Sequence, residues 1–347
     1  MSNARATHLT RRGILAAGGA LGLGAVLAAC GDDDAKNGGS DDATTAAKSG
    51  PWAFKDDRGT TVKLDKVPTK IVAFVGVAAA LHDYGIEVKG VFGPTKTQDG
   101  KADVQAGDMD ISKLTVFGNV WDQFNVEKYA AFAPEVLIST TFDSAGTLWY
   151  VPEASKDKIA KLAPSAAISV YDRQITQPLQ KMWELAESLG ADMKADKVAR
   201  SKKDFEAAAE RVRKAAKARP EIKVLAGSAS QDIFYVSGTN LSIDLEYFKA
   251  LGVKFVEPPE NAKDDGGWYE SLSWENVDKY PADIIMMDDR SSTIQPADIT
   301  EATWKKLPAV KAGQVIARSP EPILSYDKCT PLLTSLAEAI EKAKKVA

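Results

Sequence analysis

Cysteine and histidine are scarce in this chain, and their scarcity excludes several kinds of site. Its 347 residues include two cysteines and two histidines. Two distant cysteines exclude a disulfide scaffold and a cysteine-rich zinc module, and two histidines leave little for a histidine-based metal centre or a serine–histidine pair. The sequence after residue 30 also has no G-x-S-x-G turn and no glycine loop that could cradle a phosphate. It therefore offers no pattern for these classes of enzyme.

Neither sign of charge is in large excess. The chain has 44 Lys and Arg against 48 Asp and Glu, a formal net charge of −4, so nothing marks it for a nucleic-acid partner. With 44% hydrophobic residues, most of it is too apolar for a disordered protein and long enough to bury two sizeable cores. We expect a globular protein that binds no nucleic acid.

Long hydrophobic runs are also missing, and the apolar run near the start is short. It covers residues 14–29, directly follows Arg11 and Arg12, and ends in Leu-Ala-Ala-Cys at residues 27–30. This run is too short and too rich in glycine and alanine for a transmembrane helix. A basic start, a short apolar middle and small residues before the cut instead describe an export signal. The arginine pair resembles a twin-arginine signal, and Leu-Ala-Ala-Cys resembles a bacterial lipobox.

These resemblances predict how the mature chain begins. Residues 1–29 would be a signal peptide, and Cys30 would carry the lipid that anchors the protein to the outer face of the cytoplasmic membrane. An ordinary signal peptide with a chance cysteine is the alternative. Loss of three arginines would change the net charge from −4 to −7. Residues 30–51 would form a flexible linker, because residues 31–50 contain no large apolar side chain.

Short apolar runs and helical segments alternate in the next part of the chain, residues 52–173. β-branched runs that alternate with helices indicate an α/β lobe with a largely parallel sheet. The expected strands are 70–75, 88–92, 136–138 and 167–170, and the expected helices are 77–84, 125–132 and 153–162.

The alternation stops between residues 174 and 219 and then resumes. Residues 178–218 are almost wholly helix-forming and contain one glycine, Gly190, at which the helix could break. Forty helical residues would span about 60 Å. We therefore predict an inter-lobe backbone helix over 174–219 and a second α/β lobe over 220–347. The fold class is α/β: two α/β lobes joined by one long backbone helix, with a ligand cleft between the lobes. The second lobe has expected strands at 223–226, 233–236, 254–256, 283–287 and 315–317, and expected helices at 242–251 and 328–346.

Three motifs carry a resemblance to a known family. Asn125-Val126-Glu127, followed by Ala133-Pro134-Glu135-Val136, has a counterpart in Tyr280-Pro281-Ala282-Asp283. Residues 304–315 match the pattern W-x-x-L-P-A-V-x-x-G-x-V. With these motifs, the chain resembles the helical-backbone (class III, cluster A) solute-binding lipoproteins of ABC importers. Within that family it is most similar to iron–hydroxamate siderophore receptors that bind ferrioxamines.

The loops expected at the cleft are rich in aromatic residues. In an α/β fold the cleft is lined by loops at the carboxyl ends of strands, and aromatic rings with a few donors there favour a mostly apolar ligand. Compared with the family, Trp121 lies where some members have a binding arginine, Phe142 where a binding tyrosine lies, and Trp268 where a binding tryptophan lies. The full set of candidate ligand-binding residues is Trp121, Phe142, Trp149, Tyr150, Arg173, Phe234, Trp268, Tyr269, Arg290 and Tyr326.

The scarcity of cations in these loops narrows the ligand class. A ferric tris-catecholate carries about three negative charges and needs several desolvated arginines or lysines, but the loops offer only Arg173, Arg290 and Arg318. A ferric hydroxamate is close to neutral at the iron, and we expect one of the ferrioxamine type. The siderophore would chelate the iron fully, so we expect no cofactor and no protein ligand to the metal. Haem, cobalamin and a ferric catecholate remain alternative ligands.

An extracytoplasmic enzyme on the same scaffold is a further alternative, because Asp288 and Asp289 could form an acid–base pair. The resemblance instead implies binding without chemistry, and delivery of the ligand to an ABC permease. Glu153 and Glu275 match the glutamates with which family members dock on their permease. We expect a monomer in which Cys329, the thiol that remains after lipidation of Cys30, is buried, and in which His82 lies in the core.

Overall fold

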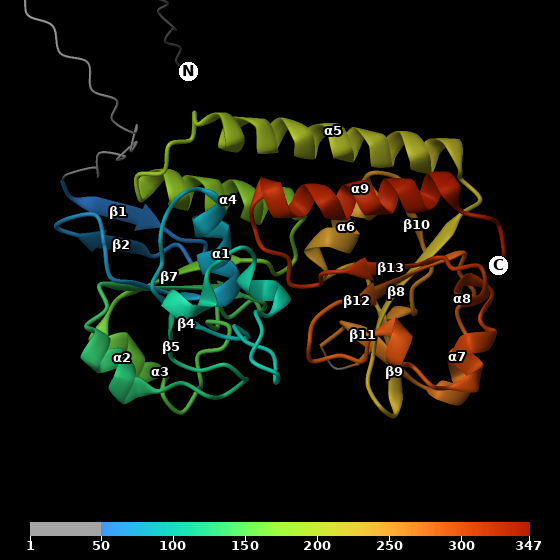
Figure 1. The fold of residues 1–347 in the computed structure, drawn as a ribbon, viewed down its shortest axis with the longest axis horizontal. Coiled ribbons are helices and arrows are strands. Elements are labelled where there is room, and N and C mark those ends of the chain that lie inside the picture. The colour runs from blue at the N-terminus through green and yellow to red at the C-terminus, as the bar shows by residue number, and fades with distance from the viewer. Residues whose placement is uncertain (1–49, 265) are drawn as a thin grey trace, which may run out of the picture. The chain divides into compact units, whose positions relative to one another are not determined.

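Two β-sheets, each with helices packed on it, form two lobes beneath a pair of long helices (Figure 1). The computed structural model describes residues 50–264 and 266–347, and these residues belong to one compact unit. The predicted signal peptide, the lipidation site Cys30 and nearly all of the predicted linker lie outside the described residues.

The sheet of the first lobe is entirely parallel and has the strand order β5-β4-β3-β6-β7. Its central strands are near-continuous apolar runs, because both faces of a parallel sheet are covered. An antiparallel hairpin, which the sequence did not indicate, precedes it. The elements are β1 (Trp52–Lys55), β2 (Thr61–Leu64), β3 (Ile71–Phe74), α1 (Val75–Asp83), β4 (Gly90–Phe92), β5 (Thr115–Val116), α2 (Val126–Phe132), β6 (Val136–Thr141), α3 (Lys156–Leu162) and β7 (Ser165–Ser169).

The sheet of the second lobe is mixed, with the order β11-β9-β8-β12-β13 and β10 beside β8. Strands β10, β12 and β13 run parallel to β8, whereas β9 is antiparallel to both of its neighbours. The elements are β8 (Lys223–Ala229), β9 (Ile233–Ser237), α6 (Ile243–Ala250), β10 (Lys254–Phe255), β11 (Tyr269–Ser273), β12 (Ile284–Asp288), α7 (Ala302–Lys306), α8 (Pro308–Lys311), β13 (Val315–Arg318) and α9 (Tyr326–Lys342). Short 3-10 helices are η1 (Val104–Ala106), η2 (Ile111–Lys113), η3 (Glu260–Ala262), η4 (Trp274–Asn276) and η5 (Pro296–Asp298).

The region between the lobes contains two helices, α4 (Thr176–Ser188) and α5 (Asp196–Ala218). The segment 174–219 is therefore not a single helix, and the break that the sequence allowed at Gly190 is present. The chain turns there after α4, at a φ of 102° that is open to glycine and strained for other residues. The predicted long helix that joins the lobes is α5. Its 23 residues span about 34 Å rather than 60 Å. Figure 1 shows α5 extending over both lobes with α9 along its length.

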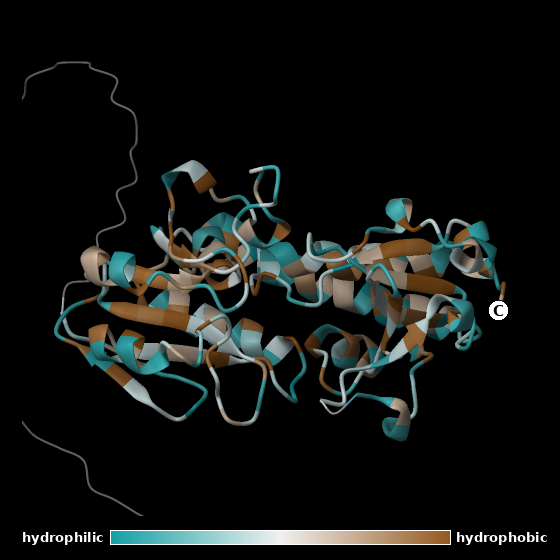
Figure 2. Cartoon of the chain, turned by 90° about the horizontal axis from the view of Figure 1, so that it is seen from below, coloured by the Kyte–Doolittle hydropathy of each residue, from teal (hydrophilic) through white to brown (hydrophobic). Residues whose placement is uncertain are grey.

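Apolar side chains hold α5 in this position. Val198, Phe205 and Val212 follow one another at intervals of seven residues, and all three are buried. They belong to a core that continues through α4 and α9 into the first lobe. A separate cluster around Phe234 forms a further core within the second lobe. Figure 2 shows the strands of both sheets as strongly hydrophobic elements. Within the described ranges, no helix is both long and apolar enough to cross a membrane.

Candidate functional site

A cavity of about 730 Å³ lies between the two lobes and is lined by residues of both. The first lobe contributes the segment that carries Trp121 and the long loop after β6. The second lobe contributes the ends of β12 and β13, the start of α6 and the loop before β11. A cavity of this size between two domains, with apolar walls and a few polar groups, is the usual form of a small-molecule site.

The first lobe supplies an aromatic wall. The ring centroid of Trp149 lies 4.5 Å from that of Phe142 and 4.6 Å from that of Trp121, and the Trp121 ring is 5.1 Å from Tyr150. Backbone and side-chain hydrogen bonds attach the Trp149 backbone to β6: its N–H donates to the Thr140 carbonyl, and its carbonyl accepts from the Ser139 hydroxyl. The rings are therefore presented by a loop that is tied to the sheet.

Two residues of this wall's loops have left-handed backbone conformations. Tyr150 has a φ of 60° and Asp122 a φ of 61°, where a residue other than glycine is held at a cost of about 1–2 kcal/mol. The Tyr150 ring packs on Phe74 of β3 at 5.5 Å. Burial, with the nearby Glu321 carboxylate, raises the pKa of Tyr150 to about 12. Its hydroxyl is thus a neutral donor at physiological pH.

The second lobe closes the aromatic wall from the other side. Trp268 lies 6.5 Å from Phe142 across the gap between the lobes, and Tyr269 packs edge-on against Tyr235 at 4.9 Å. The Asp264 carboxylate accepts from the Trp268 backbone N–H at 2.8 Å and so positions this loop. Both lobes therefore contribute aromatic surface to the cavity.

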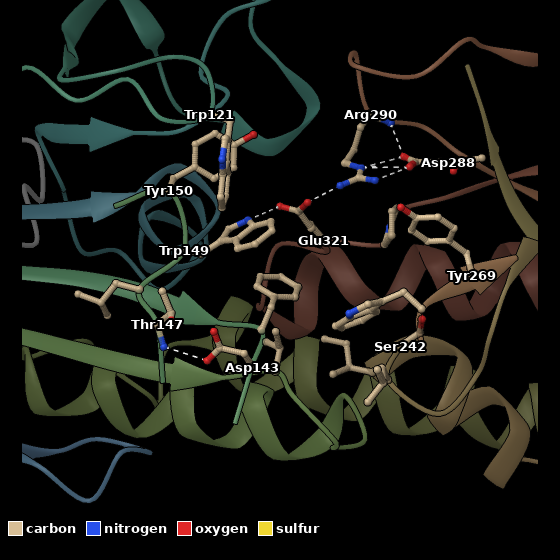
Figure 3. Close-up of a pocket in the computed structure, with 18 of the residues that line it drawn as sticks. Trp121, Asp143, Thr147, Trp149, Tyr150, Ser242, Tyr269, Asp288, Arg290 and Glu321 are labelled. Atoms are coloured by element: carbon tan, nitrogen blue, oxygen red, sulfur yellow. Dashed lines mark hydrogen bonds and ion pairs between the residues drawn. The ribbon is translucent and has the colours of Figure 1, made fainter. Parts of the chain in front are cut away.

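A polar bridge crosses the cavity beside these rings (Figure 3). Arg290 donates from Nε and Nη2 to the Asp288 carboxylate, at 3.0 and 2.6 Å, and from Nη1 to Glu321 Oε1. Glu321 Oε2 accepts from the Trp149 indole at 3.1 Å and from the Gln105 amide at 2.9 Å. Burial works to lower the pKa of Arg290, but the two carboxylates outweigh it and raise that pKa. The guanidinium is therefore charged at neutral pH, and in this structure it is paired with both carboxylates.

The second arginine of the cavity is paired as well. Arg318, at the end of β13, is 4% exposed, and its Nε lies 2.7 Å from an Asp244 carboxylate oxygen. Its Nη2 donates to the other Asp244 carboxylate oxygen at 2.9 Å, and its Nη1 donates to the Ser237 hydroxyl at 3.1 Å. This ion pair lies deep in the second lobe, where it ties the start of α6 to the sheet.

Seven of the ten candidate ligand-binding residues line the cavity. The placement of the other three in the cleft is wrong. Phe234 is 1% exposed and packs on Trp274 and Trp304 in the core. Tyr326 is buried at the start of α9 against Trp183 and Phe205. The residues that line the cavity are Trp121, Phe142, Trp149, Tyr150, Trp268, Tyr269 and Arg290.

Arg173 is the third candidate residue that does not line the cavity, because an ion pair holds its side chain against the N-terminal hairpin. Its Nη1 lies 3.1 Å from an Asp57 carboxylate oxygen in the turn of the N-terminal hairpin. It lines a separate, polar groove together with Gln177 and Lys249. The hairpin was not predicted from the sequence, so its acid could not be foreseen as the partner of Arg173.

Sequence reasoning missed three of the five acids that line the cavity, namely Asp122, Asp143 and above all Glu321. Its segment, Ser319-Pro320-Glu321-Pro322, directly follows β13. Loops that follow parallel strands line the cleft of α/β folds, so the position of this segment just after a predicted strand was the signal that could have identified Glu321. Asp143, which lines the aromatic side, accepts from the Thr147 N–H at 3.0 Å. Burial acts to raise the pKa of Asp143, but hydrogen bonds to its carboxylate together act more strongly, and the net result is a lowered pKa. This carboxylate is therefore charged at neutral pH.

The acid pair considered for catalysis does not converge on the cavity. Asp288 lines it but is paired with Arg290, whereas Asp289 bonds the Ser319 hydroxyl at 2.6 Å. Burial raises the pKa of Asp289. The two neighbouring carboxylates thus have different surroundings and separate partners.

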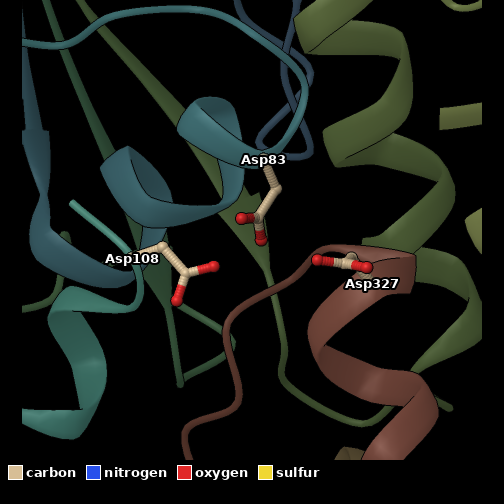
Figure 4. A group of neighbouring side chains, drawn as sticks. All are labelled: Asp83, Asp108 and Asp327. Atoms are coloured by element: carbon tan, nitrogen blue, oxygen red, sulfur yellow. The ribbon is translucent and has the colours of Figure 1, made fainter. Parts of the chain in front are cut away.

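Another acidic group lies away from the cavity, at the start of α9 (Figure 4). Carboxylate oxygens of Asp83, Asp108 and Asp327 lie within 4.8 Å of one another. Lys328 Nζ lies 2.6 Å from Asp108, and Lys197 Nζ lies 3.6 Å from Asp327. These lysines supply the positive charge that a cation would bring, and the group is a network of ion pairs.

The remaining predicted residues are placed as follows. Glu153 is exposed at the rim of the cavity before α3, and Glu275 is exposed in η4. Cys329 is buried, as expected, and its thiol donates to the Ile323 carbonyl at 3.3 Å. The prediction that His82 is a core residue is wrong: it is exposed in the last turn of α1, and its neighbour Asp83 is buried instead.

The two-lobed fold and the cavity between the lobes define a solute-binding protein. Residues 74–322 match the model of the periplasmic binding protein family, and the chain belongs to this family. Its members are solute-binding proteins rather than enzymes, and they work outside the cytoplasm. The match confirms the fold class and the family resemblance predicted from the sequence.

Individual relatives cover nearly the whole chain. The ferric-siderophore receptor protein DesE from Streptomyces coelicolor is 79% identical, with a TM-score of 0.84 over 85% of this chain and 100% of that one. The iron(3+)-hydroxamate-binding protein FhuD of Bacillus subtilis is 27% identical over 325 residues, 90% of this chain and 92% of that protein. FhuD2 from Staphylococcus aureus with bound ferrioxamine B shares the fold, with 21% identity and a TM-score of 0.52 over 79% and 98% of the chains.

Proposed function

We propose that this protein binds a ferric hydroxamate siderophore of the ferrioxamine type between its lobes and delivers it to an ABC permease for iron uptake. One observation carries the proposal: the cavity has an aromatic wall, and its two arginines, Arg290 and Arg318, each form ion pairs with carboxylates of the protein. Aromatic rings can cover the aliphatic linkers of such a ligand. The cavity offers little free positive charge, which suits an iron centre that is close to neutral.

The relatives support the same ligand class. DesE is a ferric-siderophore receptor protein, and FhuD is an iron(3+)-hydroxamate-binding protein. The fold of FhuD2 holds ferrioxamine B. The 79% identity to DesE extends over 85% of this chain and all of DesE.

The iron would arrive and leave inside its chelator. The three hydroxamate groups of such a siderophore offer six oxygens, enough to fill the coordination sphere of Fe³⁺. The protein would therefore bind the organic shell, and it needs no resident cofactor.

Titration of the intrinsic tryptophan fluorescence tests this function. The panel holds ferrioxamine B, a coprogen, a ferric catecholate, haem and cobalamin. We expect ferrioxamine B to quench the fluorescence and to saturate at one ligand per chain, because Trp121, Trp149 and Trp268 all line the cavity. A response to haem or cobalamin, with every hydroxamate silent, would keep the fold and overturn the ligand.

The lipid anchor is a separate part of the proposal. The export signal and Leu-Ala-Ala-Cys support lipidation at Cys30 and attachment to the outer face of the cytoplasmic membrane. Cys30→Ala should release the protein from membranes into the medium or the extracytoplasmic space. Membrane fractionation with mass spectrometry of the mature N-terminus tests this, and an unmodified Cys30 would contradict it.

Contact with the permease is assigned to Glu153 and Glu275, and the protein would dock as a monomer. Both glutamates are exposed, and they lie in different lobes. Reversing both charges, Glu153→Lys with Glu275→Lys, should abolish uptake of radioactive iron. Because Glu153 also lines the cavity, siderophore binding is measured for each single variant, and Glu275→Lys should preserve it. Unchanged uptake would reject the docking role, and sedimentation of the protein tests the monomer.

A further inference from the structure

The cavity carries more negative than positive charge. Its described lining residues include two arginines and five acids, a formal charge of −3. The five acids are Asp122, Asp143, Glu153, Asp288 and Glu321. Two of them, Asp288 and Glu321, face the same guanidinium, that of Arg290.

Arg290 has two hydrogen-bonding edges, and both are used. Asp288 takes the edge formed by Nε and Nη2, with contacts of 3.0 and 2.6 Å. Glu321 takes Nη1 on the other side. A guanidinium binds anionic oxygens through such edges. Without Glu321, Nη1 would be free to donate to an anionic ligand in the cavity.

Glu321 is itself held firmly between the lobes. While Oε1 faces Arg290, Oε2 accepts from the Trp149 indole and the Gln105 amide of the first lobe. Gln105 is 3% exposed and Trp149 belongs to the aromatic wall. Figure 3 shows the Glu321 carboxylate between Trp149 and Arg290. Three donors thus fix a negative charge at the centre of the cavity.

We propose that Glu321 is a specificity-determining residue: it occupies the second edge of Arg290 and thereby makes the cavity favour neutral or cationic iron complexes over anionic ones. The inference rests on the proposed siderophore-binding function and names the group that sets its charge selectivity. A ferric tris-catecholate carries about three negative charges and would meet both the repulsion of Glu321 and an arginine without a free edge. A ferric tris-hydroxamate, close to neutral at iron, avoids both.

The test compares two ligands that differ mainly in charge. The probes are the ferric tris-catecholate and the ferric tris-hydroxamate built on one tris(2-aminoethyl)amine backbone, with ferrioxamine B as a reference. Dissociation constants are measured by calorimetry for the wild-type protein, Glu321→Gln, and the control Glu127→Gln, which removes an exposed charge in α2. A shift in the ratio of the two affinities is the readout, because a purely structural role would weaken both ligands alike.

We expect Glu321→Gln to improve catecholate binding relative to hydroxamate binding by on the order of tenfold, because one repulsive charge is lost and Nη1 of Arg290 is freed. Glu127→Gln should leave the ratio unchanged. Adding Arg290→Gln to Glu321→Gln should remove the gain. Should Glu321→Gln fail to fold, Glu321→Ala replaces it, since residue 321 lies outside helices and strands.

Three results would overturn the inference: an unchanged ratio, an equal loss for both ligands, or a gain that survives Arg290→Gln. These results can be distinguished from a failure of the proposed siderophore-binding function itself. In that case the wild-type protein would bind neither ferrioxamine B nor the tripodal hydroxamate, and the inference would fall with it.

Discussion

The two lobes are built with the same structural device, yet they present different walls to the cavity. In each lobe an acid directly before a central strand accepts hydrogen bonds from the start of the neighbouring strand. Glu135, before β6, accepts from the N–H of Lys70 at 2.9 Å. Asp283, before β12, accepts from the N–H of Lys223 at 2.8 Å. The acids of the two similar sequence motifs therefore have the same structural role: each connects the starts of two neighbouring strands. We call each of these acids, with its hydrogen bonds, a clamp.

The clamps differ in burial and in the number of partners. The Glu135 side chain is 24% exposed, and it pairs with Lys66. The Asp283 side chain is fully buried, and it also binds Lys345 and the N–H groups of Val346 and Ala347. The second clamp thus secures the end of the chain as well as the sheet.

The walls differ in chemistry. The first lobe offers the closely packed, mutually tilted rings of Trp121, Phe142 and Trp149, which give contact area with little directionality. The second lobe offers Arg290 and Arg318, each paired with an acid. The first lobe therefore supplies most of the aromatic surface, which Trp268 and Tyr269 extend from the second lobe, whereas both arginines of the cavity come from the second lobe. Lobes of similar design can thus contribute unequally to recognition.

The largest expected effect comes from breaking the better clamp. Asp283→Ala should lower the free energy of unfolding by about 3 kcal/mol, because several buried donors lose their acceptor. Glu135→Ala should lower it by about 1–2 kcal/mol, since its donors are partly exposed to water. Urea unfolding of both variants measures the difference. Equal losses would show that burial does not distinguish the two clamps.

The next largest effect concerns the aromatic wall. Trp149→Ala should weaken binding of ferrioxamine B about 30-fold, or about 2 kcal/mol, because it removes the central ring of the aromatic wall. Trp149→Phe retains a ring and loses the indole donor to Glu321, and it should cost only about fivefold. Calorimetry gives both values. A Phe variant as weak as the Ala variant would mean that the donor, not the ring, dominates.

The pH dependence of stability sharpens the comparison of clamps. Hydrogen bonds from the Lys70 and Thr69 backbone, together with Lys66, lower the pKa of Glu135 from 4.5 to about 2. A carboxylate whose pKa is lower in the folded than in the unfolded chain stabilises the fold at pH values above its unfolded pKa. This contribution to stability is lost as the pH falls from about 4.5 towards 2. Glu135→Gln should therefore remove about 1–2 kcal/mol of the difference in unfolding free energy between pH 6 and pH 3, with allowance for partial exposure. An unchanged difference in urea unfolding would contradict this.

The smallest effect is expected at the edge of the aromatic wall. Trp121 is 57% exposed, so truncation removes less contact than at Trp149. Trp121→Ala should weaken ferrioxamine B binding about threefold, as expected for a rim position. Calorimetry against the Trp149 variants tests the ranking, and a loss as large as that of Trp149→Ala would place Trp121 at the centre of the ligand.

Much of the fold could be predicted because its signals are local. Buried strands such as β3 and β6 are short β-branched runs, and α2 and α9 have the apolar spacing of helices. The hairpin of β1 and β2 was missed although residues 56–60 join its strands locally, and short connections are typical of antiparallel pairs. The pairing of β11 with β9 was not foreseen because these strands lie far apart in the sequence. The helix over 174–219 was predicted too long because one glycine allows a break but does not reveal a full turn.

The candidate site divides in the same way. Aromatic residues in loops after strands, such as Phe142 and Trp149, were found because a strand's end predicts the cleft. Phe234 and Tyr326 are aromatic as well, but their side chains are buried in the protein core. An aromatic ring looks identical in sequence whether it covers a core or a ligand, and only packing separates the two.

The sequence by itself determined the α/β alternation, the long helix between the lobes, the family and the aromatic character of the cleft, because each depends on neighbouring residues or short motifs. The tertiary structure alone decided the partners of the charges. Glu321 meets Trp149 from 172 residues away and Gln105 from 216 residues away. Such contacts arise from the way the chain folds back on itself, and the selectivity of the cavity depends on them.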